Sequence, residues 1–244
     1  MTQTSEAARE GESRGSALSR FKDRLRDLAH AALRPVVLAL VGAGVGPDAV
    51  SIAGLGLSVV AGLSYFEGAF RVGSLMLLLA GLCDLLDGEI ARARKSVSVF
   101  GAFLDSTLDR LADGALLLGI AGFYLANLVE LAHSPGRVLA ELSRGLEPRT
   151  WAVVALTAMV AGVGSFLVSY TRARAEGLGL ECKVGWFERP ERMLLLMIAG
   201  FFGVGPAMPG ALLLLAVLSF VTAGQRIRHV HRITRSRPTG ADTA

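Results

Sequence analysis

The sequence of 244 residues contains little charge and few cysteines. Charged residues make up only 19% of the chain, whereas 52% of the residues are hydrophobic and the mean hydropathy is +0.51. A soluble domain of this length does not need so much apolar surface, so the composition favours an integral membrane protein. The two cysteines, Cys83 and Cys182, fall in an apolar segment and a polar loop, and we predict no disulfide framework.

Apolar segments recur along the chain at lengths suited to a bilayer. A helix crosses about 30 Å of hydrocarbon with roughly 20 residues. We expect membrane spans at 48–66, 72–94, 99–129, 150–175, 190–204 and 208–227. The fifth segment is short for a span and can be tilted or partly interfacial. The sequence therefore predicts an all-α integral membrane protein with six transmembrane helices.

The N-terminal part of the chain is polar and then amphipathic. Residues 1–15 are rich in Ser, Glu and Gly, which predicts a disordered cytoplasmic tail, and no secretory signal is visible in them. Residues 16–45 space Phe21 and Leu25 among Arg and Lys, which predicts an interfacial juxtamembrane helix. We expect Pro35 to turn or kink this helix. A short extra span after Pro35 is the competing interpretation.

The distribution of cations predicts the orientation in the membrane. Lys and Arg gather before residue 35 and in 92–95, 172–192 and 226–237. In contrast, the loop near 66–71 carries one Arg, and the loop 203–209 carries no charged residue. Since cytoplasmic loops collect positive charge, we predict a multi-pass protein of the cell membrane with both termini cytoplasmic. The membrane domain is expected over 46–228, followed by a basic cytoplasmic tail at 229–244.

Two predicted helices carry carboxylates in the stretch CDLLDGEIARARKSVSVFGAFLDSTLDRLADG. Asp84 and Asp87 are three residues apart, and Asp105 and Asp109 are four residues apart, so each pair shares one helix face. If a tight turn joins the helices, the rise of about 1.5 Å per residue places Asp87 level with Asp105 and Asp84 level with Asp109. The four carboxylates are therefore predicted to converge.

Carboxylates at this depth need a compensating charge, because each costs roughly 2.5–3.5 kcal/mol on insertion scales. Converging oxygen donors suit hard cations such as Mg²⁺ or Mn²⁺, and the lack of nearby His or Cys clusters argues against zinc or copper. The alternative is structural pairing with nearby arginines, namely Arg92, Arg94 and Arg110. Small residues on the same faces favour the close approach of a ligand instead: Gly88, Ala91 and Gly101.

The charged stretch matches a known signature. The pattern D-x-x-D-G-x-x-A-R, eight residues, then G-x-x-x-D-x-x-x-D is met by Asp84, Asp87, Gly88, Ala91, Arg92, Gly101, Asp105 and Asp109. It resembles the signature of the CDP-alcohol phosphotransferases, and the resemblance extends from GPDAVSIAGL to GQRIRHV. It implies six transmembrane helices and an N-terminal interfacial helix around a site for two Mg²⁺ or Mn²⁺ ions, usually in a homodimer.

The resemblance also implies roles for individual residues. The metal-binding set is Asp84, Asp87, Asp105 and Asp109, with Asp109 also the general base. The CDP-lipid is expected to contact Asp48, Gly88, Ala91, Arg92 and Gly101. The active site then faces the cytoplasm, and Asp113, one turn beyond the signature, is expected to be structural.

The segment SYTRARAEGLGLECKVGWFERPER contains more cations than orientation requires, although the positive-inside rule is an alternative explanation. Arginine suits phosphate, because its planar guanidinium donates two parallel hydrogen bonds. The segment resembles the family's phosphatidylinositol phosphate synthases, although Arg172 stands where lysine is expected. This resemblance implies that an acceptor phosphate is bound by Ser169, Arg172, Arg174, Arg192 and Arg226.

These features predict a metal-dependent membrane enzyme. We expect it to transfer a phosphatidyl group from CDP-diacylglycerol to a phosphorylated alcohol, inositol phosphate first, giving phosphatidylinositol phosphate and CMP. A phosphatidylglycerophosphate synthase using glycerol 3-phosphate is one alternative. A divalent-cation transporter is the alternative of another class, although it would place its acids near the membrane midplane between inverted repeats. No nucleic-acid partner is expected.

Overall fold

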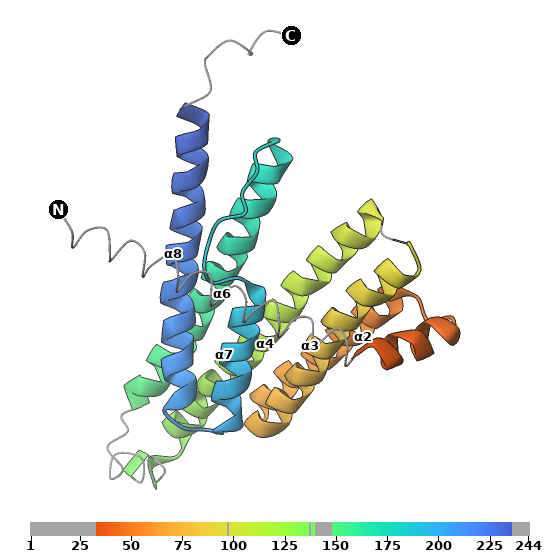
Figure 1. The fold of residues 1–244 in the computed structure, drawn as a ribbon. Helices are drawn as coiled ribbons and strands as arrows, with labels where there is room; N and C mark the ends of the chain where they lie inside the picture. Colours follow the sequence, from red (N-terminus) through yellow and green to blue (C-terminus); the bar gives the residue numbers. More distant parts are fainter. Residues whose placement is uncertain (1–32, 97, 137, 140–147, 236–244) are drawn as a thin grey trace, which may run out of the picture.

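The computed structural model describes residues 33–96, 98–136, 138–139 and 148–235, and these contain helices and no strand (Figure 1). The long helices are α2 (Pro47–Phe66), α3 (Phe70–Ala93), α4 (Val99–His133), α6 (Pro148–Gly177), α7 (Arg189–Phe201) and α8 (Ala207–Arg235). Each predicted apolar segment coincides with one of them. The tail predicted at 1–15, most of the helix predicted at 16–45 and the last nine residues lie outside the described part.

Four helices, α2, α4, α6 and α8, are long and apolar enough to cross a membrane, which confirms an integral membrane protein of all-α class. Helices α3 and α7 do not meet these criteria of length and composition, each for a separate reason. Helix α3 carries Asp84, Asp87 and Glu89 in its C-terminal half. Helix α7 has 13 residues, so it extends about 20 Å, less than the hydrocarbon thickness.

A short apolar helix, Leu33–Gly42, precedes α2. Pro35 lies inside the described part of this helix and does not end it. Ten residues extend about 15 Å, so the helix is too short for the extra span considered after Pro35. Arg94 at the end of α3 donates to the carbonyl of Val41 at 3.3 Å and joins the two segments.

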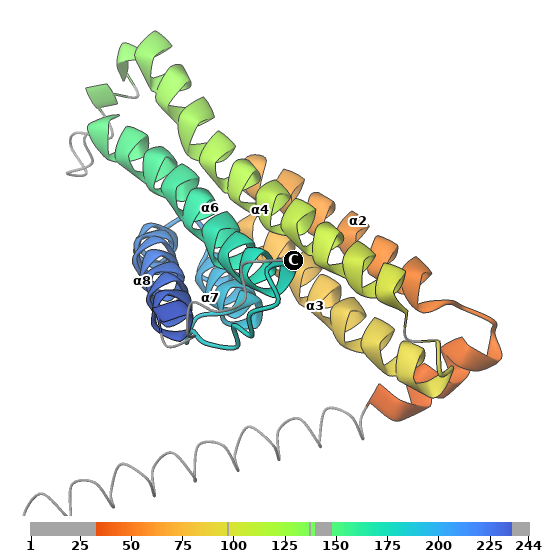
Figure 2. The same ribbon diagram turned by 90° about the horizontal axis from the view of Figure 1, so that it is seen from above.

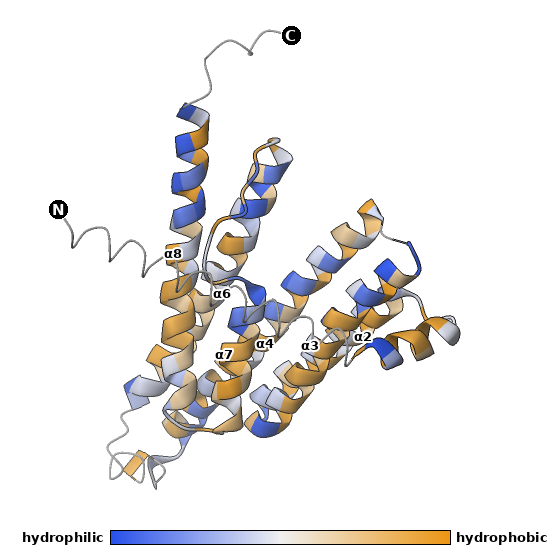
Figure 3. Ribbon diagram, in the orientation of Figure 1, coloured by the Kyte–Doolittle hydropathy of each residue, from blue (hydrophilic) through white to orange (hydrophobic). Residues whose placement is uncertain are grey.

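The six long helices pack as a closed ring in the order α2, α4, α6, α8, α7, α3. Figure 2 shows α4 and α6 between α2 on one side and α8 on the other. Buried apolar side chains from these helices form one large core, including Leu77, Leu116, Ile120, Leu196 and Leu212. Figure 3 shows polar residues gathered toward the upper ends of α3, α4, α6 and α8, so the ring has one strongly polar end.

Two N-terminal caps fix the helices that carry the charged residues. Ser98 precedes α4 in extended conformation, and its hydroxyl accepts the N–H of Gly101 at 2.9 Å. Glu188 and Glu191 form a reciprocal capping box at the start of α7, and Pro190 occupies its first turn. The first turns of α4 and α7 are therefore held firmly where the ring is polar.

Helices α2 and α4 approach to backbone contact. A β-carbon placed on Gly62 would lie 2.5 Å from the carbonyl oxygen of Ala115, and one placed on Gly119 would overlap Gly62 itself. Small residues at such a crossing let backbones meet where lipid gives no hydrophobic driving force. This contact sets the spacing of α4 from α2.

Replacing Gly62 with alanine should therefore destabilise the protein. Overpacking of this kind costs typically 1–3 kcal/mol, so Gly62→Ala should lower the thermal unfolding temperature in detergent by several degrees. Gly56→Ala, on the same helix, is the matched control, because a β-carbon there meets no atom within 4 Å. Equal unfolding temperatures for the two variants would contradict the close α2–α4 contact.

Candidate active site

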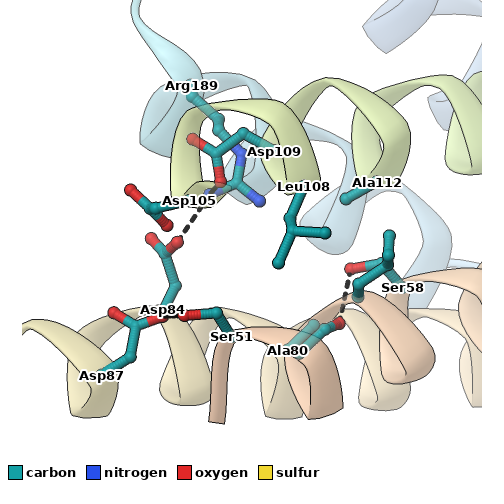
Figure 4. A pocket seen from close by; sticks show the side chains of 12 residues that line it. Ser51, Ser58, Ala80, Asp84, Asp87, Asp105, Leu108, Asp109, Ala112 and Arg189 are labelled. Atoms are coloured by element: carbon teal, nitrogen blue, oxygen red, sulfur yellow. Dashed lines mark hydrogen bonds and ion pairs between the residues drawn. The ribbon is translucent and has the colours of Figure 1, made fainter. Parts of the chain in front are cut away.

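The aspartates of α3 and α4 meet inside the polar end of the ring. One carboxylate oxygen from each of Asp84, Asp105 and Asp109 lies within 4.8 Å of the other two. Asp87 lines the same cavity, but its Oδ2 accepts the hydroxyl of Ser51 at 2.6 Å (Figure 4). The structure thus brings three of the four predicted carboxylates together and holds the fourth beside them.

The donor set of this cavity fits a hard divalent cation. The carboxylates supply several oxygen ligands on two rigid helices, and no lining residue is His or Cys. Mg²⁺ and Mn²⁺ prefer such oxygen ligands. The three arginines considered as structural partners bond elsewhere: Arg92 to Glu89, Arg94 to Val41 and Arg110 to the carbonyl of Ser106. The structure shows no ion pair between those arginines and the four aspartates among the described residues.

Arg189 of α7 supplies the positive charge that faces the aspartates. Its Nη1 lies 2.8 Å from Oδ1 of Asp84 and 2.8 Å from Oδ1 of Asp109, and its side chain is 17% exposed. In the sequence this residue was only one cation of a cluster. Its contact with Asp84 joins residues 105 positions apart, so no local spacing could reveal it.

A cavity of about 200 Å³ adjoins the aspartates on the side of α2 and the α3–α4 turn. It is lined by all five residues expected to contact the CDP-lipid, namely Asp48, Gly88, Ala91, Arg92 and Gly101. Asp87 and Asp105 line it too, so the cavity opens directly onto the carboxylates. Ser51, which sequence reasoning missed, lines both this cavity and the aspartate cavity.

A second cavity, of about 150 Å³, lies on the α6, α7 and α8 side of Asp109. Among the residues expected to bind the acceptor phosphate, four line it: Ser169, Arg172, Arg192 and Arg226. Arg174 is exposed and does not line it. Two residues along a helix turn the side chain by about 200°, so Arg174 points away from the face of Arg172. The structure therefore does not bring Arg174 together with the other four residues.

Arg192 is a deeply buried cation of this cavity, with a side chain only 4% exposed. Its Nη2 donates to Oδ2 of Asp113 at 2.9 Å, and that oxygen also accepts the hydroxyl of Ser165 at 2.8 Å. Its Nε and Nη1 are buried without a hydrogen-bond partner among the described residues. Since unpaired buried donors are costly, these atoms indicate a site for an anion.

Two further cations of this cavity, Arg172 and Arg226, contact loop 178–188. Arg226 donates to the carbonyl oxygens of Val168 at 2.5 Å and Val184 at 2.8 Å, and to Glu188 at 3.0 Å. Arg172 lies 2.9 Å from Glu176 and 3.7 Å from Glu188. Arg226 thus holds the loop against α6 and α8, and Glu188 offsets part of the positive charge.

Comparisons with known proteins agree with this geometry. The family model for CDP-alcohol phosphatidyltransferases matches residues 45–222. An archaetidylinositol phosphate synthase of Methanothermobacter thermautotrophicus is 34% identical over 75% of this chain and 82% of its own length. A phosphatidylinositol phosphate synthase of Mycobacteroides abscessus is 36% identical over 80% of this chain and 82% of its own length.

Solved structures are similar as well. The phosphatidylinositol phosphate synthase of Mycobacterium tuberculosis in complex with manganese and citrate has a TM-score of 0.67 and 29% identity, covering 86% of this chain and 92% of that chain. The same enzyme with CDP-DAG bound has a TM-score of 0.66 and 30% identity, covering 86% of this chain and 96% of that chain. The chain therefore belongs to the CDP-alcohol phosphatidyltransferase family and is a metal-dependent membrane transferase.

Proposed function

We propose that this protein transfers a phosphatidyl group from CDP-diacylglycerol to inositol phosphate and releases CMP. The observation that carries the proposal is the pair of unpartnered donors on buried Arg192, in a cavity that Asp109 shares with the aspartate cluster. A phosphorylated acceptor would satisfy these donors and bring its hydroxyl beside the carboxylate. The names of the bacterial and archaeal relatives support inositol phosphate as that acceptor.

The two cavities suggest how the substrates are arranged. The cavity lined by Asp48, Gly88 and Arg92 would take the cytidine diphosphate part of the donor, since it opens onto Asp87 and Asp105. The cavity lined by Arg192 would take the acceptor phosphate on the other side of Asp109. The donor phosphate and the acceptor hydroxyl would then meet at the carboxylates between the two cavities.

The reaction is an in-line displacement at phosphorus. Asp109 accepts the proton of the acceptor hydroxyl, and the hydroxyl oxygen forms a bond to the β-phosphorus of the donor. The bond between that phosphorus and the bridging oxygen breaks, and CMP leaves with the electron pair. The guanidinium of Arg192 holds the acceptor phosphate, so its contribution is orientation.

The metal-binding set proposed here is Asp84, Asp87, Asp105 and Asp109, with Ser51 orienting Asp87 through its hydrogen bond. Bound Mg²⁺ or Mn²⁺ ions would supply charge stabilisation at the phosphoryl oxygens and make CMP a better leaving group. Since both helices are fixed by the α2–α4 and α3–α7 packing, the carboxylates need little rearrangement to act as ligands.

We further propose six membrane spans, with α3 and α7 completing the set of α2, α4, α6 and α8. The charged half of α3 and the first turn of α7 lie at the polar end of the ring, where the site is (Figure 3). This location accounts for the charges in α3 and for the short length of α7. Clustered cations at that end support a cytoplasmic active site and cytoplasmic termini. The family resemblance supports an N-terminal interfacial helix and a homodimer.

Acceptor preference tests the proposed function. CMP release from CDP-diacylglycerol with Mg²⁺ or Mn²⁺ should be fast with inositol 1-phosphate or inositol 3-phosphate and slow with free inositol, because free inositol leaves the buried donors of Arg192 unpaired. Glycerol 3-phosphate and serine, supplied separately, complete the panel. Faster turnover with glycerol 3-phosphate would instead make the protein a phosphatidylglycerophosphate synthase. If no acceptor caused CMP release, the transferase proposal would fail and a divalent-cation transporter would be the remaining alternative.

Truncating Arg192 should weaken acceptor binding selectively. A hydrogen bond to a charged group contributes about 1.5–3 kcal/mol, so Arg192→Ala should raise the acceptor KM about ten- to a hundredfold while the donor KM stays nearly constant. Arg174→Ala is the matched control, since Arg174 lies outside the cavity. Steady-state CMP release at varied acceptor concentration measures both. An unchanged acceptor KM in Arg192→Ala would refute the phosphate site.

Removing the proposed base should separate chemistry from donor binding. Asp109→Asn should lower kcat by at least about 100-fold, because general base catalysis is lost. Binding of CDP-diacylglycerol should largely survive, since Asp87 and Asp105 still line the nucleotide cavity. Asp105→Asn is the comparison, and it should weaken metal and donor binding together. If Asp109→Asn lost donor binding in proportion to its activity, Asp109 would be mainly a metal ligand.

A further inference from the structure

Arg189 lies between two cavities of the site, the aspartate cavity and the cavity lined by Arg192. Together with Asp109 it lines both the aspartate cavity and the cavity of Arg192. It extends from the first turn of α7, which the capping box holds in place. Figure 4 shows its guanidinium directed at the carboxylates of Asp84 and Asp109.

The guanidinium contacts the same carboxylates that offer ligand oxygens to a divalent cation. Its Nη1 lies 2.8 Å from Oδ1 of Asp84 and 2.8 Å from Oδ1 of Asp109. A cation bound at those oxygens would stand a few ångströms from a second positive charge in a site that is only partly exposed to water. Such like charges repel strongly at short distance, so the two cations compete for one set of oxygens.

The geometry gives the guanidinium an alternative position. Its Nε lies 3.6 Å from Oδ1 of Asp113, toward the cavity of Arg192, and has no hydrogen-bond partner among the described residues. An anion in that cavity would offer oxygens to Arg189 on the side away from Asp84. Movement of the guanidinium toward this anion would free the carboxylates.

We propose that Arg189 is a positioning residue that couples metal binding to acceptor binding. It competes with the divalent cation for Asp84 and Asp109, and the phosphate of the acceptor relieves this competition. The coupling rests on the proposed function for the identity of the acceptor, whereas the competition with the metal does not. Because linkage is reciprocal, the metal must raise the affinity for the acceptor by the same factor.

The first test measures Mn²⁺ affinity of the full chain in detergent without any acceptor, from the electron paramagnetic resonance signal of free Mn²⁺. Arg189→Gln should bind Mn²⁺ about five- to tenfold more tightly than the wild type, within the usual range of coupling between sites. Lys183→Gln is the control for net charge, since Lys183 is exposed, pairs with Glu181 and lies outside both cavities. Unchanged or weaker Mn²⁺ binding by Arg189→Gln would overturn the competition.

The second test repeats the titration with inositol 1-phosphate and, separately, glycerol 3-phosphate. The wild type should gain about five- to tenfold in Mn²⁺ affinity, and Arg189→Gln less than about twofold, because its carboxylates are already free. Equal gains in both proteins would mean simple attraction between anion and cation and would overturn the coupling. No gain in the wild type would also overturn it, while the first test still decides the competition by itself.

The wild type provides a measurement that does not depend on the folding of any variant. Its affinity for inositol 1-phosphate, measured by calorimetry with and without Mn²⁺, should rise by the same factor as its Mn²⁺ affinity rises with inositol 1-phosphate. An unchanged acceptor affinity overturns the coupling, and a rise supports it when the second test finds the smaller gain in Arg189→Gln that excludes simple attraction between anion and cation.

Discussion

Attraction between the carboxylates of α3 and α4 and the guanidinium groups of α7 governs the polar end of this protein. Asp84 and Asp109 face Arg189, and Asp113 faces Arg192, within a ring of helices whose other surfaces are largely apolar. Charges buried in this setting remain only when partners hold them. The capping box at the start of α7 therefore matters to the site, because it fixes the turn that presents both arginines.

Packing of the helix backbones sets the distances between these carboxylates and guanidinium groups. Helix α2 contacts both α3 and α4, and its Gly62 meets the backbone of α4 directly. Helix α7 bridges α3 and α8, which brings the start of α7 over the aspartates from the opposite side. The cavity lined by Asp48 and the cavity lined by Arg192 both adjoin the aspartates, the first through Asp87 and Asp105 and the second through Asp109. In the proposed function, the six-helix ring would give the two substrates separate approaches to the shared aspartates.

Local spacing predicted the helices and the shared faces of the aspartates, because both follow from the pattern along single helices, whereas the residues expected around the CDP-lipid came from the family resemblance. Interactions between distant segments could not be predicted in the same way. Ser51 and Asp87 are 36 residues apart, and Arg192 and Asp113 are 79 residues apart, so only packing brings each pair together. Asp113 was expected to be structural, and it anchors the buried guanidinium of the acceptor cavity. The motif match that named Arg174 takes no account of helical phase, and the structure places Arg174 outside the cavity that Arg172 lines.

The central claim is that the aspartates and the buried arginine form one continuous site in which the acceptor phosphate lies next to the metal-binding carboxylates. Paramagnetic relaxation of the ³¹P signal of inositol phosphate by bound Mn²⁺ tests this most directly, because the effect falls steeply with distance. Strong relaxation is expected in the wild type, and it should be lost in Arg192→Ala. A ³¹P signal that bound Mn²⁺ leaves unrelaxed in the wild type would contradict it.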